Sequence, residues 1–224
     1  MIGLRQAFAI NMKFTILTAL ALLVLCLFVS TTTAQKPDPD KDYDAQITKI
    51  KNGDTRADYK ALRILFSQTK AYSAYGNESD DTKAAFAAYE KKDYKAAAKS
   101  AEAALKAFYL DMDAHIAASV AYKEIGDTDK EAFHKAVYVG LMNSILDSGD
   151  GKTPETAYVV ISTHEEYVAL RALGLAFQGQ ALNNLKDHTF DVMTAVDPKT
   201  KASAKVYFNI DISWAAETKM FSKP

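Results

Sequence analysis

The stretch that decides the fold runs from Thr82 to Leu146 and reads TKAAFAAYEKKDYKAAAKSAEAALKAFYLDMDAHIAASVAYKEIGDTDKEAFHKAVYVGLMNSIL. It is rich in alanine, which has the highest helix propensity and lets neighbouring helices approach closely. Aromatic residues recur among the alanines and can fill the space that small side chains leave. A turn at Gly126-Asp127 separates two helical runs. The stretch therefore predicts an array of closely packed helices.

Part of this pattern returns after about 34 residues. Phe86 is followed at this offset by Val120, and Leu105 by Val139. The offset is that of the tetratricopeptide repeat, in which two antiparallel helices stack on the next pair and share an apolar face with it. We therefore predict tetratricopeptide-like helical hairpins within a helical part that spans residues 43–147 and holds about six helices.

The periodicity changes after this helical part. Residues 158–161 are short and β-branched, and residues 190–196 and 204–210 alternate as strands on either side of a turn that begins at Asp197-Pro198. An isolated hairpin is marginally stable, so we expect the first segment to join it as a third strand. Residues 163–175 have helical spacing. The sequence thus predicts an α+β fold, with a three-stranded antiparallel sheet and a covering helix in residues 148–224, packed on the helical part.

The first 34 residues differ from the rest of the chain. No charged residue occurs between Lys13 and Lys36, and the run ends in small and polar residues up to Ala34. A basic start, an apolar centre and a small-residue end are typical of a secretory signal peptide, with cleavage before Gln35. We expect export, with a periplasmic or extracellular mature protein. The alternative is an uncleaved membrane anchor, because the apolar run is long enough to cross a bilayer. Residues 35–42 are polar and contain two prolines, which predicts a tether.

Composition limits the partners and the chemistry. The net charge is −1 and the single cysteine, Cys26, lies inside the apolar run. Cleavage would remove it, so we expect neither disulfides nor thiol chemistry in the mature chain. A nucleic-acid-binding protein would need a clustered basic excess, so nucleic acid is not an expected partner. Contact with a membrane is expected only through an uncleaved signal segment.

The glycine-rich loop at residues 149–153 invites a nucleotide-binding or ion-binding interpretation. A phosphate-binding loop would need glycine at position 146, where the chain has leucine, and a calcium loop of the EF-hand type would need acidic residues at positions 146 and 157. An irregular ion site at Asp147 and Asp150 stays open beside the simpler interpretation of a glycine turn. We expect no metal ion and no cofactor.

A second acidic group opens the helix predicted after residue 162. His164-Glu165-Glu166 resembles the start of a zinc-binding helix, but the required second histidine is absent because position 168 is valine. Acidic residues in a first helical turn also interact favourably with the helix dipole. The sequence therefore predicts no catalytic residue. Asp147, Asp150, Glu165 and Glu166 are the binding candidates.

Several short motifs occur in a fixed order along residues 53–210. They are Gly53-Asp54-Thr55, Tyr59-Lys60-Ala61-Leu62, Tyr72 with Tyr75, Ser148-Gly149-Asp150-Gly151, Glu165-Glu166-Tyr167 and Tyr207-Phe208-Asn209-Ile210. Together they resemble the domain-of-unknown-function family 4919, although the chain has Ala74 where the family pattern has proline. The resemblance implies a secreted bacterial protein and implies no known activity.

These observations favour an extracytoplasmic binding or scaffolding protein whose helices offer a groove to a peptide or protein partner. The alternative is a cell-envelope hydrolase whose carboxylates meet at the junction of the helical part and the α+β module.

Overall fold

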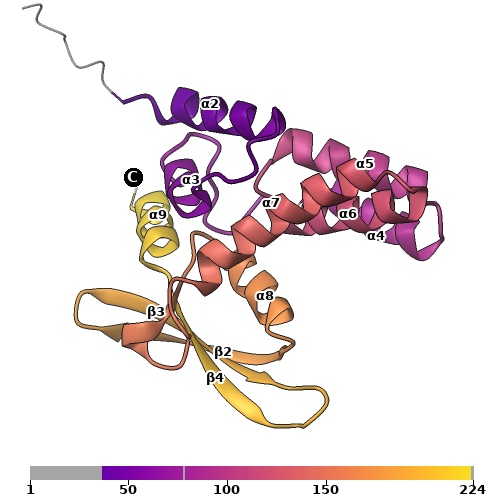
Figure 1. Ribbon diagram of the computed structural model, residues 1–224. Coiled ribbons are helices and arrows are strands. Elements are labelled where there is room, and N and C mark those ends of the chain that lie inside the picture. The colour runs from indigo at the N-terminus through magenta and orange to yellow at the C-terminus, as the bar shows by residue number, and fades with distance from the viewer. Residues whose placement is uncertain (1–36, 78, 223–224) are drawn as a thin grey trace, which may run out of the picture. The chain divides into compact units, whose positions relative to one another are not determined.

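The computed structural model describes residues 37–77 and 79–222, and residues 38–224 form one compact unit (Figure 1). The predicted signal peptide and the start of the tether lie outside the described residues. Within the described ranges, none of the helices combines the length and apolar character that a membrane crossing requires. Six helices come first: α2 (Pro39–Lys51), α3 (Tyr59–Phe66), α4 (Asp80–Glu90), α5 (Tyr94–Ala107), α6 (Met112–Ile125) and α7 (Thr128–Leu146).

The first helix begins earlier than predicted. Residues 39–42 were predicted as part of a tether, but α2 starts at Pro39. The Asp38 side chain caps the helix by accepting from the Lys41 N–H, and proline suits the first helical position because its missing N–H would be unpaired there. Asp40 and Asp42 lie in the first turn, where negative charge is favourable. The polar composition thus marks a helix start.

Aspartate begins most of these helices. Asp58, Asp93, Asp111 and Asp127 accept from N–H groups in the first turns of α3, α5, α6 and α7. Each such cap contributes about 1 kcal/mol by satisfying an N–H that the helix leaves without a partner. At the opposite end of α6, Gly126 adopts a left-handed conformation with φ of 86°, which glycine tolerates. Short loops between capped ends give the antiparallel order of α4 to α7.

Helices α4 to α7 pack in chain order, and α4 also contacts α6. Small side chains fill the space between α4, α5 and α6, with Ala85, Ala97, Ala101, Ala114 and Ala118 buried there. This is the arrangement of two successive helical hairpins. Their assignment to the tetratricopeptide repeat stays a prediction.

The described C-terminal part contains a sheet, a short 3₁₀ helix and two α-helices: η2 (Pro154–Thr156), β1 (Tyr158–Val159), α8 (Thr163–Ala172), β2 (Ala176–Leu185), β3 (His188–Val196), β4 (Ser203–Asn209) and α9 (Asp211–Phe221). The strand order is β1-β4-β3-β2. The β3–β4 hairpin is antiparallel, with Met193 opposite Val206 and Asp191 opposite Phe208. The α+β class and the predicted hairpin are confirmed.

Two details of the predicted sheet are wrong. The sheet has four strands, because residues 176–185 form β2, and β1 pairs with β4 in parallel. Alanine, glutamine, glycine and asparagine dominate β2 and are weak strand formers, so residues 176–185 have no clear strand pattern. The predicted covering helix ends at Ala172, and Gly174, with φ of 72°, turns the chain into β2. Helix α9 was not predicted.

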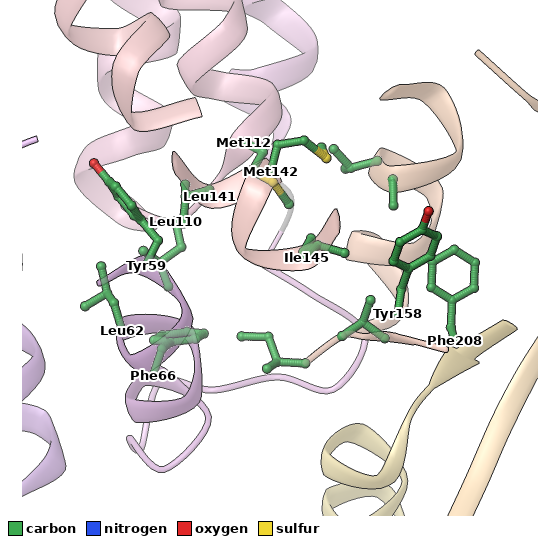
Figure 2. Close-up of a cluster of buried hydrophobic side chains, with 14 of the residues drawn as sticks. Tyr59, Leu62, Phe66, Leu110, Met112, Leu141, Met142, Ile145, Tyr158 and Phe208 are labelled. Carbon is green, nitrogen blue, oxygen red and sulfur yellow. The ribbon is translucent and has the colours of Figure 1, made fainter. Parts of the chain in front are cut away.

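One core joins the helices to the sheet. Its buried side chains include Leu62 and Phe66 of α3, Ile145 of α7, and Met193 and Phe208 of the sheet, and Figure 2 shows that Tyr158 and Phe208 lie close to the end of α7. The two halves therefore bury apolar area against each other, at roughly 25 cal/mol per Å² removed from water. Gly140 lets α3 and α7 approach, because a Cβ there would lie 2.1 Å from the Tyr59 ring.

Candidate binding cleft

Of the two sequence candidates at the glycine loop, Asp150 is held by local interactions. The Asp150 carboxylate accepts from the Thr156 hydroxyl at 2.6 Å and from the Lys152 N–H at 3.1 Å. These hydrogen bonds lower the pKa of Asp150 to about 2, the Thr156 bond contributing most. The Gly151 carbonyl of the loop also accepts a hydrogen bond from the Tyr207 N–H at 2.8 Å. The loop therefore connects the end of α7 to β4. Asp147 ends α7 and lines an open hollow of about 440 Å³.

Glu165 belongs to a buried ion pair. Arg63 donates to both Glu165 oxygens, through Nε at 2.8 Å and through Nη2. The same guanidinium donates to the Val159 carbonyl at 3.0 Å and to the Ser144 hydroxyl at 3.1 Å, while the Ile161 N–H donates to Glu165 at 2.8 Å. We call Arg63, Glu165, Ser144, Val159 and Ile161 the junction cluster. It connects α3, α7, α8 and the β1 segment, and with both charges buried it is a structural element.

Glu166 points away from the junction cluster, toward the sheet. It is fully buried, and burial raises its pKa to about 9, with the nearby Asp191 carboxyl adding to the effect. Burial also raises the pKa of Asp191, whose Oδ2 accepts from the Gln180 amide at 2.5 Å. At neutral pH Glu166 therefore carries a proton.

The structure does not bring the four candidates together. Among the described residues, no hydrogen bond or ion pair joins Asp147 or Asp150 to Glu165 or Glu166. Within residues 37–77 and 79–222, no group of three or more histidine, cysteine, aspartate or glutamate side chains is arranged to hold a metal ion.

A different group of residues surrounds a cleft of about 500 Å³ in the helical part. We call it the helical cleft. It lies among α2, α5 and α7, and its volume is in the range of small-ligand sites, about 300–1,000 Å³. The lining residues are Lys51, Glu102, Leu105, Lys106, Tyr109, Lys130, Phe133 and His134. Apolar and aromatic side chains thus form the walls, and charged ends extend over them.

A chain of hydrogen bonds runs along one wall of the helical cleft. His115 Nε2 lies 2.9 Å from the Tyr109 carbonyl, His115 Nδ1 lies 3.1 Å from His134 Nδ1, and His134 Nε2 lies 3.3 Å from Glu102 Oε1. The Tyr122 hydroxyl also donates to Glu102 Oε1, at 3.0 Å. Glu102 is the acidic residue of the cleft lining, and its carboxylate is already held by two donors.

The proton positions follow from the partners. The Tyr109 carbonyl only accepts, so His115 Nε2 carries a proton. Burial lowers the pKa of His115 to about 3, so the ring is neutral and its Nδ1 accepts. His134 Nδ1 must then donate to it. The contact with His134 Nε2 is the largest of the effects that lower the pKa of Glu102.

The lysines of the helical cleft lie over aromatic rings. Lys51 Nζ is 4.9 Å from the centre of the Tyr109 ring, and Lys130 Nζ is 4.6 Å from that of Tyr122. Lys130 also pairs with Asp127 at 3.8 Å. Lys51 and Lys106 have no carboxylate within ion-pair distance in the described part of the chain. The lining contains three lysines and one carboxylate, so the cleft holds excess positive charge beside apolar walls.

The sequence alone did not predict this cleft. Its residues come from Lys51, from α5 and from α7, and none of them forms a motif with its neighbours in the chain. His115 and His134 are nineteen positions apart in the sequence, and only the antiparallel packing of α6 and α7 joins their rings. The aromatic contacts of His134 with Tyr122 and Phe133 fix its ring further.

A match to a family model shows which protein family the chain belongs to. The model of a Domain of unknown function (DUF4919) matches residues 38–219. The chain belongs to this family. No curated protein and no solved structure gives a significant match to it. The DUF4919 domain therefore spans the six helices, the sheet and nearly all of α9, and both the junction cluster and the helical cleft lie inside it.

Proposed function

We propose that this DUF4919 protein is an extracytoplasmic binding or scaffolding protein, and that the helical cleft receives an acidic segment of a peptide or protein partner. After signal cleavage it would act in the periplasm or outside the cell. The observation that carries the proposal is the pair of lysines, Lys51 and Lys106, which lie beside apolar walls and have no carboxylate partner among the residues that the structure describes. A partner segment with a carboxylate and an apolar side chain would satisfy both features.

Two further observations support this site. Tyr109 lines the cleft, and its buried hydroxyl has no hydrogen-bond partner among the described residues. The Tyr109, Phe133 and Leu105 side chains offer apolar area, and aromatic residues are enriched where partners bind. The cleft is large enough for a few side chains of a partner.

The alternative function, a cell-envelope hydrolase with carboxylates at the junction of the two halves, has weaker support. Glu165 is held on both oxygens by Arg63, and Asp150 by its own loop. A general acid or base must reach the proton that it transfers. Glu166 has the raised pKa of an acid catalyst but is fully buried.

The test uses the chain from Gln35 to Pro224, which contains the whole described core. The tagged protein is immobilised and exposed to envelope extract, and the retained proteins are quantified by mass spectrometry. The Lys51→Glu and Lys106→Glu double variant should lose at least about 90% of the specific partner, which corresponds to a loss of about 1.4 kcal/mol or more.

The matched control reverses two exposed lysines elsewhere, Lys123 on α6 and Lys205 on β4. It has the same net charge, so loss of partner in both variants would indicate non-specific charge attraction. Equal retention by wild type and by the cleft variant would refute the helical cleft as the binding site.

A further inference from the structure

Strand β2 forms the edge of the sheet opposite β1, and this edge is exposed. Strand β2 has ten residues and lies at the end of the strand order, beyond β3. Nine of its positions are exposed and the remaining one, Gly179, is half-buried, although the Tyr167 ring of α8 contacts the Phe177 ring near the start of the strand. Figure 1 shows β2 and β3 extending beyond the helices that pack on the sheet. An edge strand presents a row of N–H and C=O groups that another strand can pair with.

The usual protection of such an edge is missing here. No charged residue and no proline occurs between Arg171 and Lys186. Edge strands are normally protected by lysine, proline, short length or a covering element. A register shift between Phe177 and Gly179 is the irregularity in this strand, and the pairing from Gly179 to Leu185 is regular. Phe177, Leu182 and Leu185 also expose large apolar side chains there.

We propose that two copies of this chain associate through β2, antiparallel about a two-fold axis, to form one sheet shared by both. A β-strand can satisfy the whole row of backbone groups at the edge. The side chains are compatible with a second copy, because β2 consists of alanine, phenylalanine, leucine, glycine, glutamine and asparagine. None of these is charged, so no like charges meet across the pair.

Amide side chains strengthen the case for self-pairing. Glutamine and asparagine each carry a donor and an acceptor, so amides of one copy can pair with amides of the other. Gln178, Asn183 and Asn184 are exposed on β2. A two-fold axis places the same patch on both partners, and a self-complementary patch is what such an interface requires. The helical cleft is built from α2, α5 and α7, so the pairing uses none of its residues.

The first test is sedimentation velocity on the chain from Gln35 to Pro224 over a range of concentrations. We expect a dimer whose fraction rises with concentration. Ala181→Lys places a charge at the centre of β2, where position 181 is exposed, and brings two like charges together in the dimer. It should raise the dissociation constant at least about tenfold. The matched control is Ala84→Lys, at an exposed position of α4.

Cross-linking gives a second readout that does not depend on the lysine variant. The chain from Gln35 contains no cysteine, so Ala181→Cys provides a single reactive site, with Ala84→Cys as control. A short bismaleimide should join two copies through position 181 and not through position 84. A wild-type chain that stays monomeric up to on the order of 100 μM would overturn the proposal. A dimer that persists in Ala181→Lys without cross-linking at position 181 would equally overturn it.

Discussion

The junction cluster and the helical cleft both contain charged side chains, but the charges are used differently. At the junction, Arg63 and Glu165 are buried and each guanidinium nitrogen of Arg63 donates to an acceptor on another element. In the cleft, Lys51 and Lys106 reach no carboxylate of the described chain. Removing one partner of a buried pair leaves an uncompensated charge, whereas exposed lysines cost little to replace. The first region holds the fold, and the second has charge available for a partner.

The largest expected effect is at the junction cluster. Arg63→Ala leaves Glu165 buried without its partner and should cost about 3–5 kcal/mol of unfolding free energy. Urea denaturation followed by circular dichroism measures this. Helix and sheet signals should shift together, because the cluster and the core join both halves.

The control for this variant is Lys60→Ala, an exposed lysine on the same helix. It should change stability by no more than about 0.5 kcal/mol. If Arg63→Ala were as mild as Lys60→Ala, the structural role of the junction cluster would be wrong.

Glu166 extends the comparison to a second buried carboxyl. Its pKa is about 9 in the folded chain against 4.5 as the ordinary value. The folded state therefore keeps a proton that the unfolded state loses, and stability should be full below pH 4.5 and fall as pH rises toward 9. The slope is up to about 1.4 kcal/mol per pH unit.

Glu166→Gln should remove this slope, since glutamine does not ionise. Unfolding free energies at several pH values between 5 and 9, roughly the range between the two pKa values, measure it. Glu155→Gln, at an exposed position, is the control and should keep the slope. An unchanged pH profile in Glu166→Gln would show that another group causes the dependence.

A smaller effect is expected from Glu102, the carboxylate of the helical cleft. Its side chain is 46% exposed, so solvent weakens its pairing with His134. Because its pKa is lowered, the stability that it contributes is present above the ordinary pKa of 4.5 and is lost as pH falls through the lower folded value. Glu102→Gln should cost less than about 1 kcal/mol at pH 7.

Unfolding free energies measured at decreasing pH distinguish the pairing of Glu102 with His134 from the general effect of removing a carboxylate. The variant should lose less stability than wild type on going below pH 4.5, while the exposed control Glu124→Gln should follow wild type. A loss at pH 7 as large as that of Arg63→Ala would place Glu102 with the structural residues.

The sequence predicted the parts of the fold that have strong local signals. The alanine-rich helices and the β3–β4 hairpin carry regular periodicity, and both were confirmed. Strand β2 was missed because its exposed position removes the alternation that marks a half-buried strand. For the pair Tyr207 and Phe208 the alternation alone does not say which side chain faces inward, and the structure buries Phe208 completely.

The candidate site was less predictable for a different physical reason. Glu165 and Glu166 share a helix start, yet one turns to Arg63 and the other toward Asp191. Arg63 and Glu165 are 102 positions apart in the chain. Sequence spacing predicts neighbours within one element, but the partners of these carboxylates come from other elements. Lys51 and Lys106 likewise come from different elements, α2 and α5, and line the same cleft only in the folded chain.

The most direct test of the comparison is the unfolding free energy of the Lys51→Ala and Lys106→Ala double variant at pH 7. The cation–π contact of Lys51 at an accessible site contributes at most about 1 kcal/mol, and Lys106 forms no ion pair within residues 37–77 and 79–222. We predict that the double variant stays within about 1 kcal/mol of wild type, while Arg63→Ala in the same experiment loses about 3–5 kcal/mol. A loss of comparable size in both variants would show that the cleft lysines hold the fold, and would contradict the account.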